Sequence, residues 1–326
     1  MTRVIAVTNY KGGIGKTTTT VNVAAGLALK ENRVLVVDVD PQSNTRMCFG
    51  LDEPRKSLYD VLIDGKKVQD CVVAARPNID LLAASDALLQ AQSDIGKRAD
   101  WGRVLETALR PVVREYDAVL IDCSASMTVL NLNALMAASD IIVPTALEHL
   151  ALQGLRQLGR NISRIRGTMG ALRMIIPTMF DARTGQSHRL LANVQEEYGA
   201  LVTIPIRVNV RLSEATAVGK TIFEYDPRSN GAIDYAALVE KLSETLNIKP
   251  QVNPMLQRET FVPPIRMNQA TATPQANDHV NYSGTTQQTC PYCGRPLEQI
   301  MLAGYRVYFC DHCKYKRQEL ASGVRR

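Results

Sequence analysis

Short apolar runs and longer helix-like segments alternate along the first 248 residues. Each run is rich in Val, Ile and Leu, and the segments between the runs are long enough for helices. This order predicts a doubly wound α/β fold, in which a mostly parallel sheet carries helices on both faces. We expect strands in the apolar runs at residues 4–9, 33–40, 117–124, 140–145, 171–178 and 201–206.

The alternating pattern stops after residue 248. Residues 249–289 contain five prolines and six glutamines without apolar periodicity, which predicts a flexible linker between a domain at 1–248 and a small module at 290–326. No run approaches 18 apolar residues, so we expect no transmembrane helix and no membrane partner. The chain enters its first strand at once, which leaves no room for a signal peptide and favours a cytoplasmic protein.

A glycine-rich segment, NYKGGIGKTTTT, follows the first predicted strand and precedes a predicted helix at 17–32. It fits the phosphate-loop spacing G-x-x-x-x-G-K-[ST] loosely. In such a loop the backbone N–H groups close on phosphate oxygens, the lysine reaches the β- and γ-phosphates, and the threonine hydroxyl binds Mg²⁺. The helix N-terminus adds a favourable dipole. We therefore expect a nucleotide site made of Lys11, Gly12, Gly13, Ile14, Gly15, Lys16, Thr17 and Thr18, in which Lys11 is one lysine more than the loop needs.

Carboxylates end the next two predicted strands that matter to this site. Asp38 and Asp40 close the run at 33–40 and lie on the same side of the strand, because side chains alternate along it. Asp122 follows four apolar residues at the end of another run. An acid there commonly holds the Mg²⁺ shell in phosphate-loop enzymes. The predicted magnesium set is Thr17, Asp38, Asp40 and Asp122.

Charge and cysteines are concentrated at the C-terminal end. The chain carries a net charge of +6, and residues 290–326 supply +4 of it, from seven Lys/Arg and three Asp/Glu. Four of the seven cysteines form two C-x-x-C pairs with sixteen residues between them, a spacing within the range of a Cys₄ zinc site. We therefore predict a zinc ribbon with Cys290, Cys293, Cys310 and Cys313 as ligands, and a rubredoxin-type iron site is the alternative.

The motifs together resemble the deviant Walker A ATPases of the ParA/MinD superfamily. The resemblance rests on KGGIGKTTTT, VVDVDPQSN and YDAVLIDCSAS in this order, and it continues through ASDIIVPTALEHLALQGL, PTMFDART and residues 204–238. It covers about residues 2–245, and its last stretch favours the ParA partition branch. The resemblance implies an ATP hydrolase of the P-loop class that depends on Mg²⁺.

The resemblance also implies individual roles. Lys11 is similar to the family's signature lysine, which reaches the nucleotide of the partner in an ATP-sandwich homodimer, and Lys16 serves its own ATP. Asp40 would activate the hydrolytic water, so the catalytic set is Lys11, Lys16 and Asp40. Ser124 and Ala125 depart from the usual proline pair. Cys123 has no partner at a cluster spacing, and we interpret it as a small buried residue.

Two sets of basic residues are candidates for binding DNA without sequence preference. Arginines at every fourth position from 156 form one stripe on a predicted helix, opposite an apolar face that includes Leu158 and Ile162. A second set surrounds the RLSEA segment, where the resemblance implies DNA contacts. A solvated basic face is the alternative for the stripe. The candidates are Arg156, Arg160, Arg164, Arg207, Arg211, Lys220 and Arg228.

These features favour a ParA-type ATPase that positions or segregates a DNA cargo on the nucleoid through a ParB-like adaptor, with ATP, Mg²⁺ and Zn²⁺ as ligands. A MinD-like, membrane-cycled ATPase would need a C-terminal amphipathic helix, and the chain ends instead in the predicted ribbon. A nucleotide-dependent reductase would need cluster cysteines in the ATPase domain. A nucleotide-switched DNA-binding regulator is a further alternative.

Overall fold

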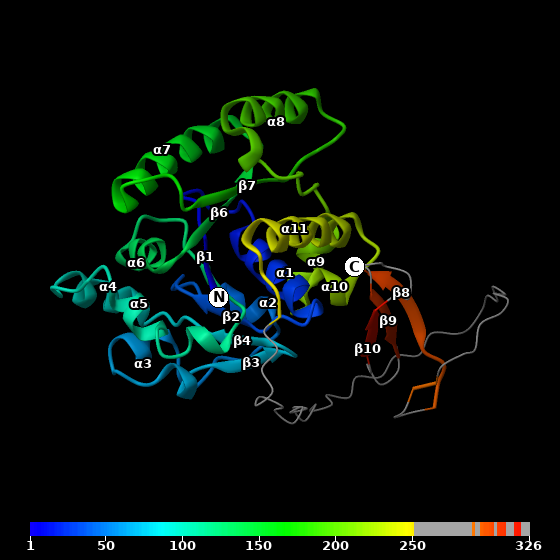
Figure 1. Cartoon of the computed structure of the whole chain (residues 1–326), viewed down its shortest axis with the longest axis horizontal. Coiled ribbons are helices and arrows are strands. Elements are labelled where there is room, and N and C mark those ends of the chain that lie inside the picture. Colours follow the sequence, from blue (N-terminus) through cyan, green and yellow to red (C-terminus); the bar gives the residue numbers. More distant parts are fainter. Residues whose placement is uncertain (251–288, 291–293, 303–304, 311–315, 321–326) are drawn as a thin grey trace. The chain divides into compact units, whose positions relative to one another are not determined.

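The computed structural model describes residues 1–250, 289–290, 294–302, 305–310 and 316–320 (Figure 1). The chain divides into two units, Met1–Val252 and Asn253–Arg326. Most of the segment predicted as a linker, 251–288, lies outside the described residues. None of the described helices is both long and apolar enough to cross a membrane.

The first unit is built on a seven-stranded sheet in the order β3-β4-β2-β5-β1-β6-β7. Its strands pair in parallel, except that β3 runs antiparallel to β4. This confirms the predicted α/β fold with a mostly parallel sheet. The strands are β1 (Arg3–Val7), β2 (Val34–Asp38), β3 (Val73–Arg76), β4 (Ile79–Leu82), β5 (Ala118–Asp122), β6 (Asp140–Ala146) and β7 (Leu172–Thr178).

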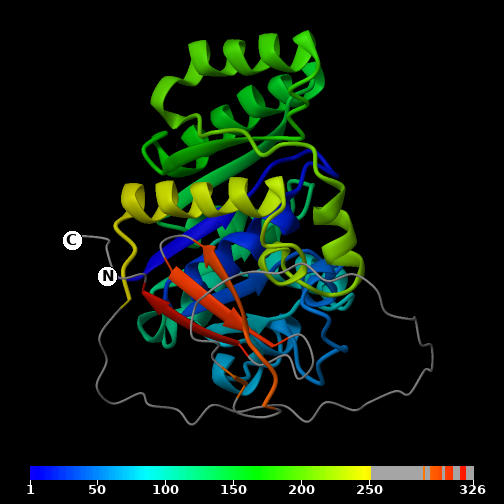
Figure 2. The ribbon, with the colours of Figure 1, turned by 90° about the vertical axis from the view of Figure 1, so that its right-hand side faces the viewer.

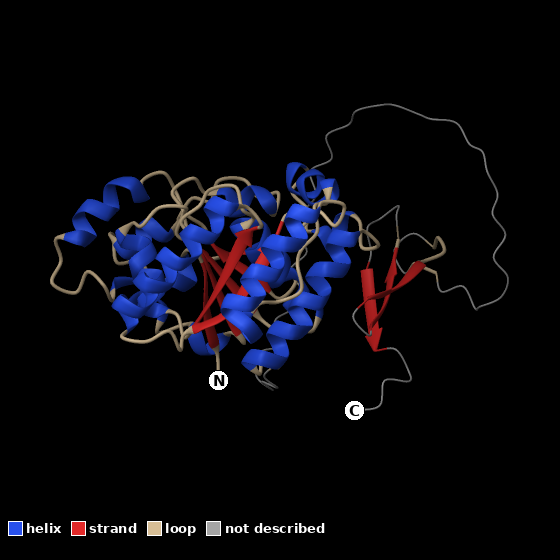
Figure 3. Cartoon of the chain, turned by 90° about the horizontal axis from the view of Figure 1, so that it is seen from above, coloured by secondary structure: helices blue, strands red, loops and turns tan. Residues whose placement is uncertain are grey.

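Helices cover both faces of this sheet (Figure 3). One face carries α1 and α11, which pack against each other beside α9 and α10, and the other carries α3 to α7 (Figure 2). The helices are α1 (Lys16–Leu29), α2 (Asn44–Cys48), α3 (Leu58–Leu62), α4 (Leu88–Gly96), α5 (Val104–Leu109), α6 (Val129–Ala137), α7 (His149–Arg166), α8 (Gly185–Tyr198), α9 (Val210–Ala217), α10 (Ile222–Tyr225) and α11 (Asn230–Leu246).

The central strands are buried on both sides, which explains why they are continuous apolar runs. Every residue of β2, β5 and β6 is buried. In a parallel sheet between two helix layers both faces of a strand need apolar side chains, so alternation disappears. The same arrangement brings the carboxyl ends of β1, β2 and β5 to one edge, because these strands are neighbours in the sheet.

Two details of the sheet differ from the prediction. Residues 201–206 are wrong as a strand: a 3₁₀ turn, Gly199–Leu201, leads into a segment that meets β7 through an isolated bridge between Ile175 and Val202. The Thr203 N–H also donates to the Ile175 carbonyl oxygen at 3.0 Å and the Ile206 N–H to that of Pro177 at 2.7 Å, but these bonds do not form a strand ladder. Pro205 has no N–H to continue such a ladder. Conversely, the sequence does not predict β3, at the edge of the sheet, or β4, next to it, because these short strands carry polar residues such as Arg76 and Asp80.

The described part of the second unit is an antiparallel sheet in the order β10-β9-β8, formed by β8 (Glu298–Leu302), β9 (Tyr305–Phe309) and β10 (Lys316–Leu320). The sequence of β9, YRVYF, alternates between aromatic or apolar residues and other residues less strictly than a half-buried strand, but it carries the β-branched and aromatic residues typical of strands. Ahead of β8, the Gly294 N–H donates to the Cys290 carbonyl oxygen at 2.9 Å, and the Cys290 N–H donates to that of Arg295 at 2.7 Å. These bonds hold Cys290 next to Gly294 and Arg295.

Candidate nucleotide-binding site

The predicted phosphate loop connects β1 to α1, as its sequence requires. Gly13 and Gly15 have φ of 72° and 87°, the left-handed conformation that favours glycine. No atom would lie within 4 Å of a Cβ added at either position, so the backbone conformation, not crowding, selects glycine here. The loop is closed by the Lys16 ammonium, which donates to the Lys11 carbonyl oxygen at 2.9 Å.

Lys16 lies in a position that suits a phosphate. The residue is only 7% exposed, and burial lowers the pKa of its ammonium, although the carboxylate of Asp122 opposes this shift. A partly desolvated cation at the N-terminus of a helix gains from an anion, because the helix dipole favours negative charge at the same place.

Three threonine hydroxyls converge on the Asp122 carboxylate at the end of β5. Thr17 and Thr20 of α1 donate to its two oxygens at 2.7 and 2.8 Å, and Thr45 of α2 donates at 3.0 Å. Burial raises the pKa of Asp122 above its ordinary value, and these hydroxyls oppose the shift. The structure therefore brings together the Thr17 hydroxyl and the Asp122 carboxylate of the predicted magnesium set.

Asp38 is the neighbour of Asp122 in the paired strands β2 and β5. Its carboxylate is fully buried and accepts the backbone N–H of Asp40 at 3.0 Å and of Thr45 at 3.3 Å. Burial, with repulsion from the Asp122 carboxylate, raises its pKa well above the ordinary range. Two adjacent buried acids disfavour two negative charges, and a divalent cation would relieve that repulsion.

Asp40 lies two residues beyond Asp38, in the turn that precedes α2. It is half-buried, and its carboxylate accepts the Gln42 N–H of its own turn at 3.0 Å. No group of three or more His, Cys, Asp or Glu side chains that could hold a metal ion occurs in the described part of the chain. The structure thus does not gather Asp38, Asp40 and Asp122 into one ligand group, and their role as a magnesium set stays a prediction.

The hard oxygens of Thr17 and Asp122 nevertheless fit Mg²⁺. This ion is usually held by one or two protein oxygens, several waters and substrate phosphates. The buried and mutually repelling acids at this edge supply negative charge that a cation would neutralise. The donor set therefore suits magnesium bound together with a nucleotide phosphate.

Lys11 lies at the rim of the loop and forms an ion pair with Glu148, which precedes α7. Both side chains are partly exposed, at 31% and 57%. The Lys11 N–H donates to the Asn9 side-chain oxygen at 3.3 Å, and the Asn9 amide donates to the Pro144 carbonyl oxygen at 2.8 Å. The base of Lys11 is thereby fixed to β6, while its ammonium remains accessible.

The turn at Ser124 and Ala125 is held by a side chain instead of by prolines. The Asn131 oxygen of α6 accepts the Ser124 N–H at 3.1 Å, and its amide donates to the Ser124 carbonyl oxygen at 2.9 Å. Ala125 faces the phosphate loop, because a Cβ added at Gly12 would lie 3.9 Å from the Ala125 Cβ. Cys123 is buried as predicted, and burial raises its pKa.

Sequence reasoning missed Thr20, Thr45 and Glu148. Thr20 follows Thr17 by three residues, which places both hydroxyls on one helix face. The run of threonines could therefore have predicted that Thr20 lies at the site with Thr17. Thr45 and Glu148 carried none, because their partners are Asp122 and Lys11, far away in the sequence.

The predicted basic stripe on α7 is exposed, and its opposite face, with Leu158 and Ile162, is buried as expected. Arg156 pairs with Glu197 of α8 at 2.7 Å. Arg160 donates to the Gln157 side chain at 2.6 Å. Binding of this stripe to DNA stays a prediction.

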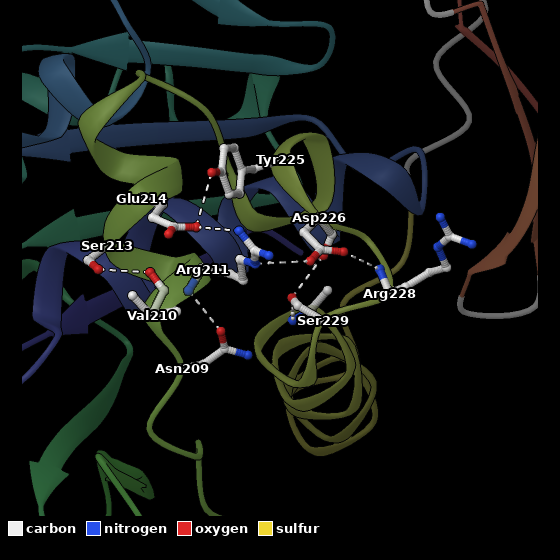
Figure 4. A network of polar contacts seen from close by, with 10 residues as sticks. Asn209, Val210, Arg211, Ser213, Glu214, Tyr225, Asp226, Arg228 and Ser229 are labelled. Atoms are coloured by element: carbon white, nitrogen blue, oxygen red, sulfur yellow. Dashed lines mark hydrogen bonds and ion pairs between the residues drawn. The ribbon is translucent and has the colours of Figure 1, made fainter. Parts of the chain in front are cut away.

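The second basic set divides into paired and less constrained members. Arg207 forms a bidentate ion pair with Asp234 of α11, with a shortest distance of 2.7 Å. Arg211 of α9 pairs with Glu214 at 2.8 Å and with Asp226 at 3.6 Å (Figure 4). Lys220 is exposed, and the Arg228 N–H donates to the Asp226 carboxylate at 3.2 Å. A bidentate pair occupies Arg207, so Arg211 is the better-placed phosphate contact.

Of the four predicted zinc ligands, Cys290 and Cys310 are described, and each is 2% exposed. Cys293 and Cys313 lie outside the described residues. The Gly294 N–H donates to the Cys290 carbonyl oxygen, and Gly294 has a positive φ of 69°. Zinc binding stays a prediction.

Strand, glycine loop, helix and strand-end acids together define a P-loop ATPase. A family model described as an AAA domain matches residues 2–174. The chain is 37% identical over 250 residues to the sporulation initiation inhibitor protein Soj of Bacillus subtilis, with 74% of this chain and 99% of Soj covered. It is 37% identical to the chromosome partitioning protein ParA of Caulobacter vibrioides, with 74% and 93% covered.

Among solved structures, cobyrinic acid a,c-diamide synthase from Mycobacterium smegmatis with bound ADP and magnesium matches with a TM-score of 0.66 at 32% identity, over 78% of this chain and 100% of that one. The chain therefore belongs to the ParA/MinD-type family of P-loop ATPases. The relatives match about three quarters of this chain, which is the share that its first unit occupies.

Proposed function

We propose that this protein is a ParA-type partition ATPase, which binds ATP with Mg²⁺, forms an ATP-sandwich dimer, binds DNA without sequence preference and releases it on hydrolysis. The observation that carries the proposal is the meeting of Lys16, Thr17 and Asp122 at one edge of the sheet, with a second lysine, Lys11, at the rim of the same loop. The partition role follows from the similarity to Soj and to a chromosome partitioning ParA.

In this proposal different residues of the chain have different roles at the nucleotide phosphates. Backbone N–H groups of the loop and the Lys16 ammonium bind the nucleotide, and Thr17 with Asp122 would hold Mg²⁺, which neutralises phosphate charge. Asp40, outside the buried acid pair, orients the attacking water. Lys11 turns from Glu148 to the nucleotide of a second copy and stabilises charge there, as an arginine finger does.

The remaining roles are assigned to surfaces. Contacts with the phosphates of nucleoid DNA are made by Arg211, Lys220, Arg228 and the stripe on α7. Such contacts give affinity for DNA of any sequence, because phosphates carry no base information. A ParB-like adaptor would stimulate hydrolysis and connect the cycle to a cargo. The second unit would bind Zn²⁺ through Cys290, Cys293, Cys310 and Cys313, supported by the Gly294 hydrogen bond to Cys290 and the burial of two of the cysteines.

Binding to DNA in the presence of different nucleotides tests this function. With ATP and Mg²⁺, the protein should bind unrelated duplexes of equal length with equal affinity and a steep salt dependence, and with ADP it should not. Lys16→Ala should lose the ATP effect, because the phosphates lose their charge partner. Lys30→Ala is the matched control, since Lys30 pairs with Glu240 away from the loop. Binding that ignores the nucleotide, or that depends on one sequence, would refute the proposal.

A further inference from the structure

Arg76, the last residue of β3, contacts three segments that are far apart in the sequence. Its guanidinium donates to the Phe49 carbonyl oxygen at 2.9 Å, to the Gly219 carbonyl oxygen at 2.9 Å and to the Glu224 carboxylate at 2.6 Å. It also lies 5.7 Å from the centre of the Phe49 ring. A planar guanidinium presents five N–H donors in a fixed fork, which suits three partners that lie in different directions better than the compact ammonium of a lysine does.

The segment on one side of Arg76 is tied to the buried acids. Thr45 of α2 donates its N–H to Asp38 and its hydroxyl to Asp122. The C-terminal end of α2 runs into Phe49, whose carbonyl oxygen Arg76 holds. A five-residue helix with both ends fixed moves as one piece, so a change at the acid pair is passed to Phe49.

The backbones on the two sides of Arg76 touch directly. A Cβ added at Gly219 would lie 2.4 Å from the Gly50 Cα and 2.7 Å from its nitrogen, distances that no side chain tolerates. Both glycines have positive φ. Gly50 therefore packs closely on the loop between α9 and α10. Arg76 bonds a backbone carbonyl oxygen on each side of this contact.

The segment on the other side of Arg76 determines where Arg211 lies. Glu224, which Arg76 holds through one oxygen, caps α10 by accepting the Thr221 N–H with the other at 2.8 Å. The next residue, Tyr225, donates to Glu214 at 3.0 Å, and Glu214 pairs with Arg211, as Figure 4 shows. A continuous series of contacts thus runs from the acid pair to the exposed arginine.

We propose that Arg76 is a positioning residue that couples the nucleotide site to the α9–α10 surface, so that binding of nucleotide at the acid pair changes the order of α9 and α10. The inference rests on the proposed function in one respect, that Arg211 is a DNA contact. The coupling itself needs no DNA. A second connection, the Ile222 N–H bond to the Asn22 side chain of α1 at 2.8 Å, is the competing route from the phosphate loop.

Hydrogen exchange of the full-length protein, with and without a non-hydrolysable ATP analogue and Mg²⁺, measures the coupling. In the wild type the analogue should slow exchange about tenfold in residues 44–50 and in residues 211–225. In Arg76→Met the first effect should persist and the second should fall below about twofold, because the shape is largely kept and the donors are lost. Arg76→Lys should restore part of it. These fold-changes follow from one or two lost hydrogen bonds.

Controls separate coupling from unfolding and from loss of ligand. Analogue affinity by calorimetry should stay within about threefold of wild type, because the groups that the Arg76 guanidinium bonds, on Phe49, Gly219 and Glu224, do not belong to the phosphate loop. Arg98→Met, which removes an arginine bonded to Asp100 and the Leu62 carbonyl oxygen, should behave as wild type. Should Arg76→Met not fold, Glu224→Gln removes the charge of one partner and should give a reduced response in 211–225.

Three results would overturn the proposal. The first is a full response of residues 211–225 in the Arg76 and Glu224 variants, which would assign the coupling to the Asn22 route. The second is the loss of both responses together, which would mean a defect in binding. The third is no response of residues 211–225 in the wild type. If the coupling is found but the protein binds no DNA, the proposed DNA surface is wrong and the role of Arg76 stands.

Discussion

Arg207 and Arg211 are four residues apart, yet the structure predicts opposite consequences of replacing them. Arg207 donates through its side chain and its backbone N–H to Asp234, whose side chain is 8% exposed. Arg211 is half exposed, and its acidic partners are also partly exposed. We expect Arg207→Ala to lower stability without removing a DNA contact, and Arg211→Ala to remove a DNA contact without lowering stability.

The magnitude for Arg207 follows from this burial. Breaking a buried pair costs about 3–5 kcal/mol, and an exposed pair contributes about 0–1 kcal/mol. The Arg207 side chain is 37% exposed and Asp234 keeps one backbone N–H, so we take an intermediate cost of about 2 kcal/mol. For a unit of this size that corresponds to a fall in Tm of about 4–8 °C.

The assay combines thermal unfolding with DNA binding at several salt concentrations on the same samples. Arg207→Ala should show the fall in Tm with a nearly unchanged salt slope, and Arg211→Ala should reduce the slope by about 1 at an unchanged Tm. Asp234→Ala and the double variant complete a cycle in which the two changes should not add. A wild-type Tm for Arg207→Ala, or an equal loss of salt slope in both single variants, would refute this reasoning.

Two further predictions concern the buried acids and the cysteines. Because burial raises the pKa of Asp38, its contribution to stability is present below about pH 4 and is lost as pH rises through its folded pKa. In metal-free urea titrations, Asp38→Asn should therefore flatten the fall in the free energy of unfolding with pH, by up to about 1.4 kcal/mol per pH unit. The control Asp52→Asn, at an exposed position, should leave this slope unchanged. An unchanged slope in Asp38→Asn would contradict the burial argument. Cys290→Ser with Cys293→Ser should remove one zinc per chain and spare ATP binding, because metal supplies most of the folding free energy of so small a unit; a wild-type protein without metal in elemental analysis would contradict it.

Much of the sheet could be predicted because its central strands are buried on both faces. In β2 and β5 this burial requires continuous apolar runs, and the runs end at Asp38 and Asp122. The same stretches of sequence therefore predict both the strands and the acidic residues of the site. The short strands β3, at the edge of the sheet, and β4, next to it, lack that signal, since Arg76 and Asp80 interrupt the apolar pattern. Residues 201–206 are apolar like a buried strand but form no strand ladder, because they meet β7 through one isolated bridge and two further backbone hydrogen bonds.

The residues of the candidate site could be predicted only where they lie within one sequence motif or at the end of a predicted strand. Glycine spacing, Lys16 and Thr17 lie within one segment, and the strand-end acids follow from the order of strands. The hydroxyl of Thr45 reaches Asp122 across 77 residues, and Glu148 reaches Lys11 across 137. Nothing in the surroundings of either residue in the sequence indicates such a contact, which exists only after the chain has folded.

The central claim is that one lysine of the loop serves the chain's own nucleotide and the other that of a second copy. Sedimentation equilibrium of Asp40→Ala with ATP and Mg²⁺ tests it most directly, because this variant should bind ATP and dimerise without hydrolysing it. We expect twice the chain mass of 35.9 kDa, and we expect that adding Lys11→Ala returns the protein to a monomer that still binds ATP. A monomer with Asp40→Ala alone, or a dimer that persists without Lys11, would contradict it.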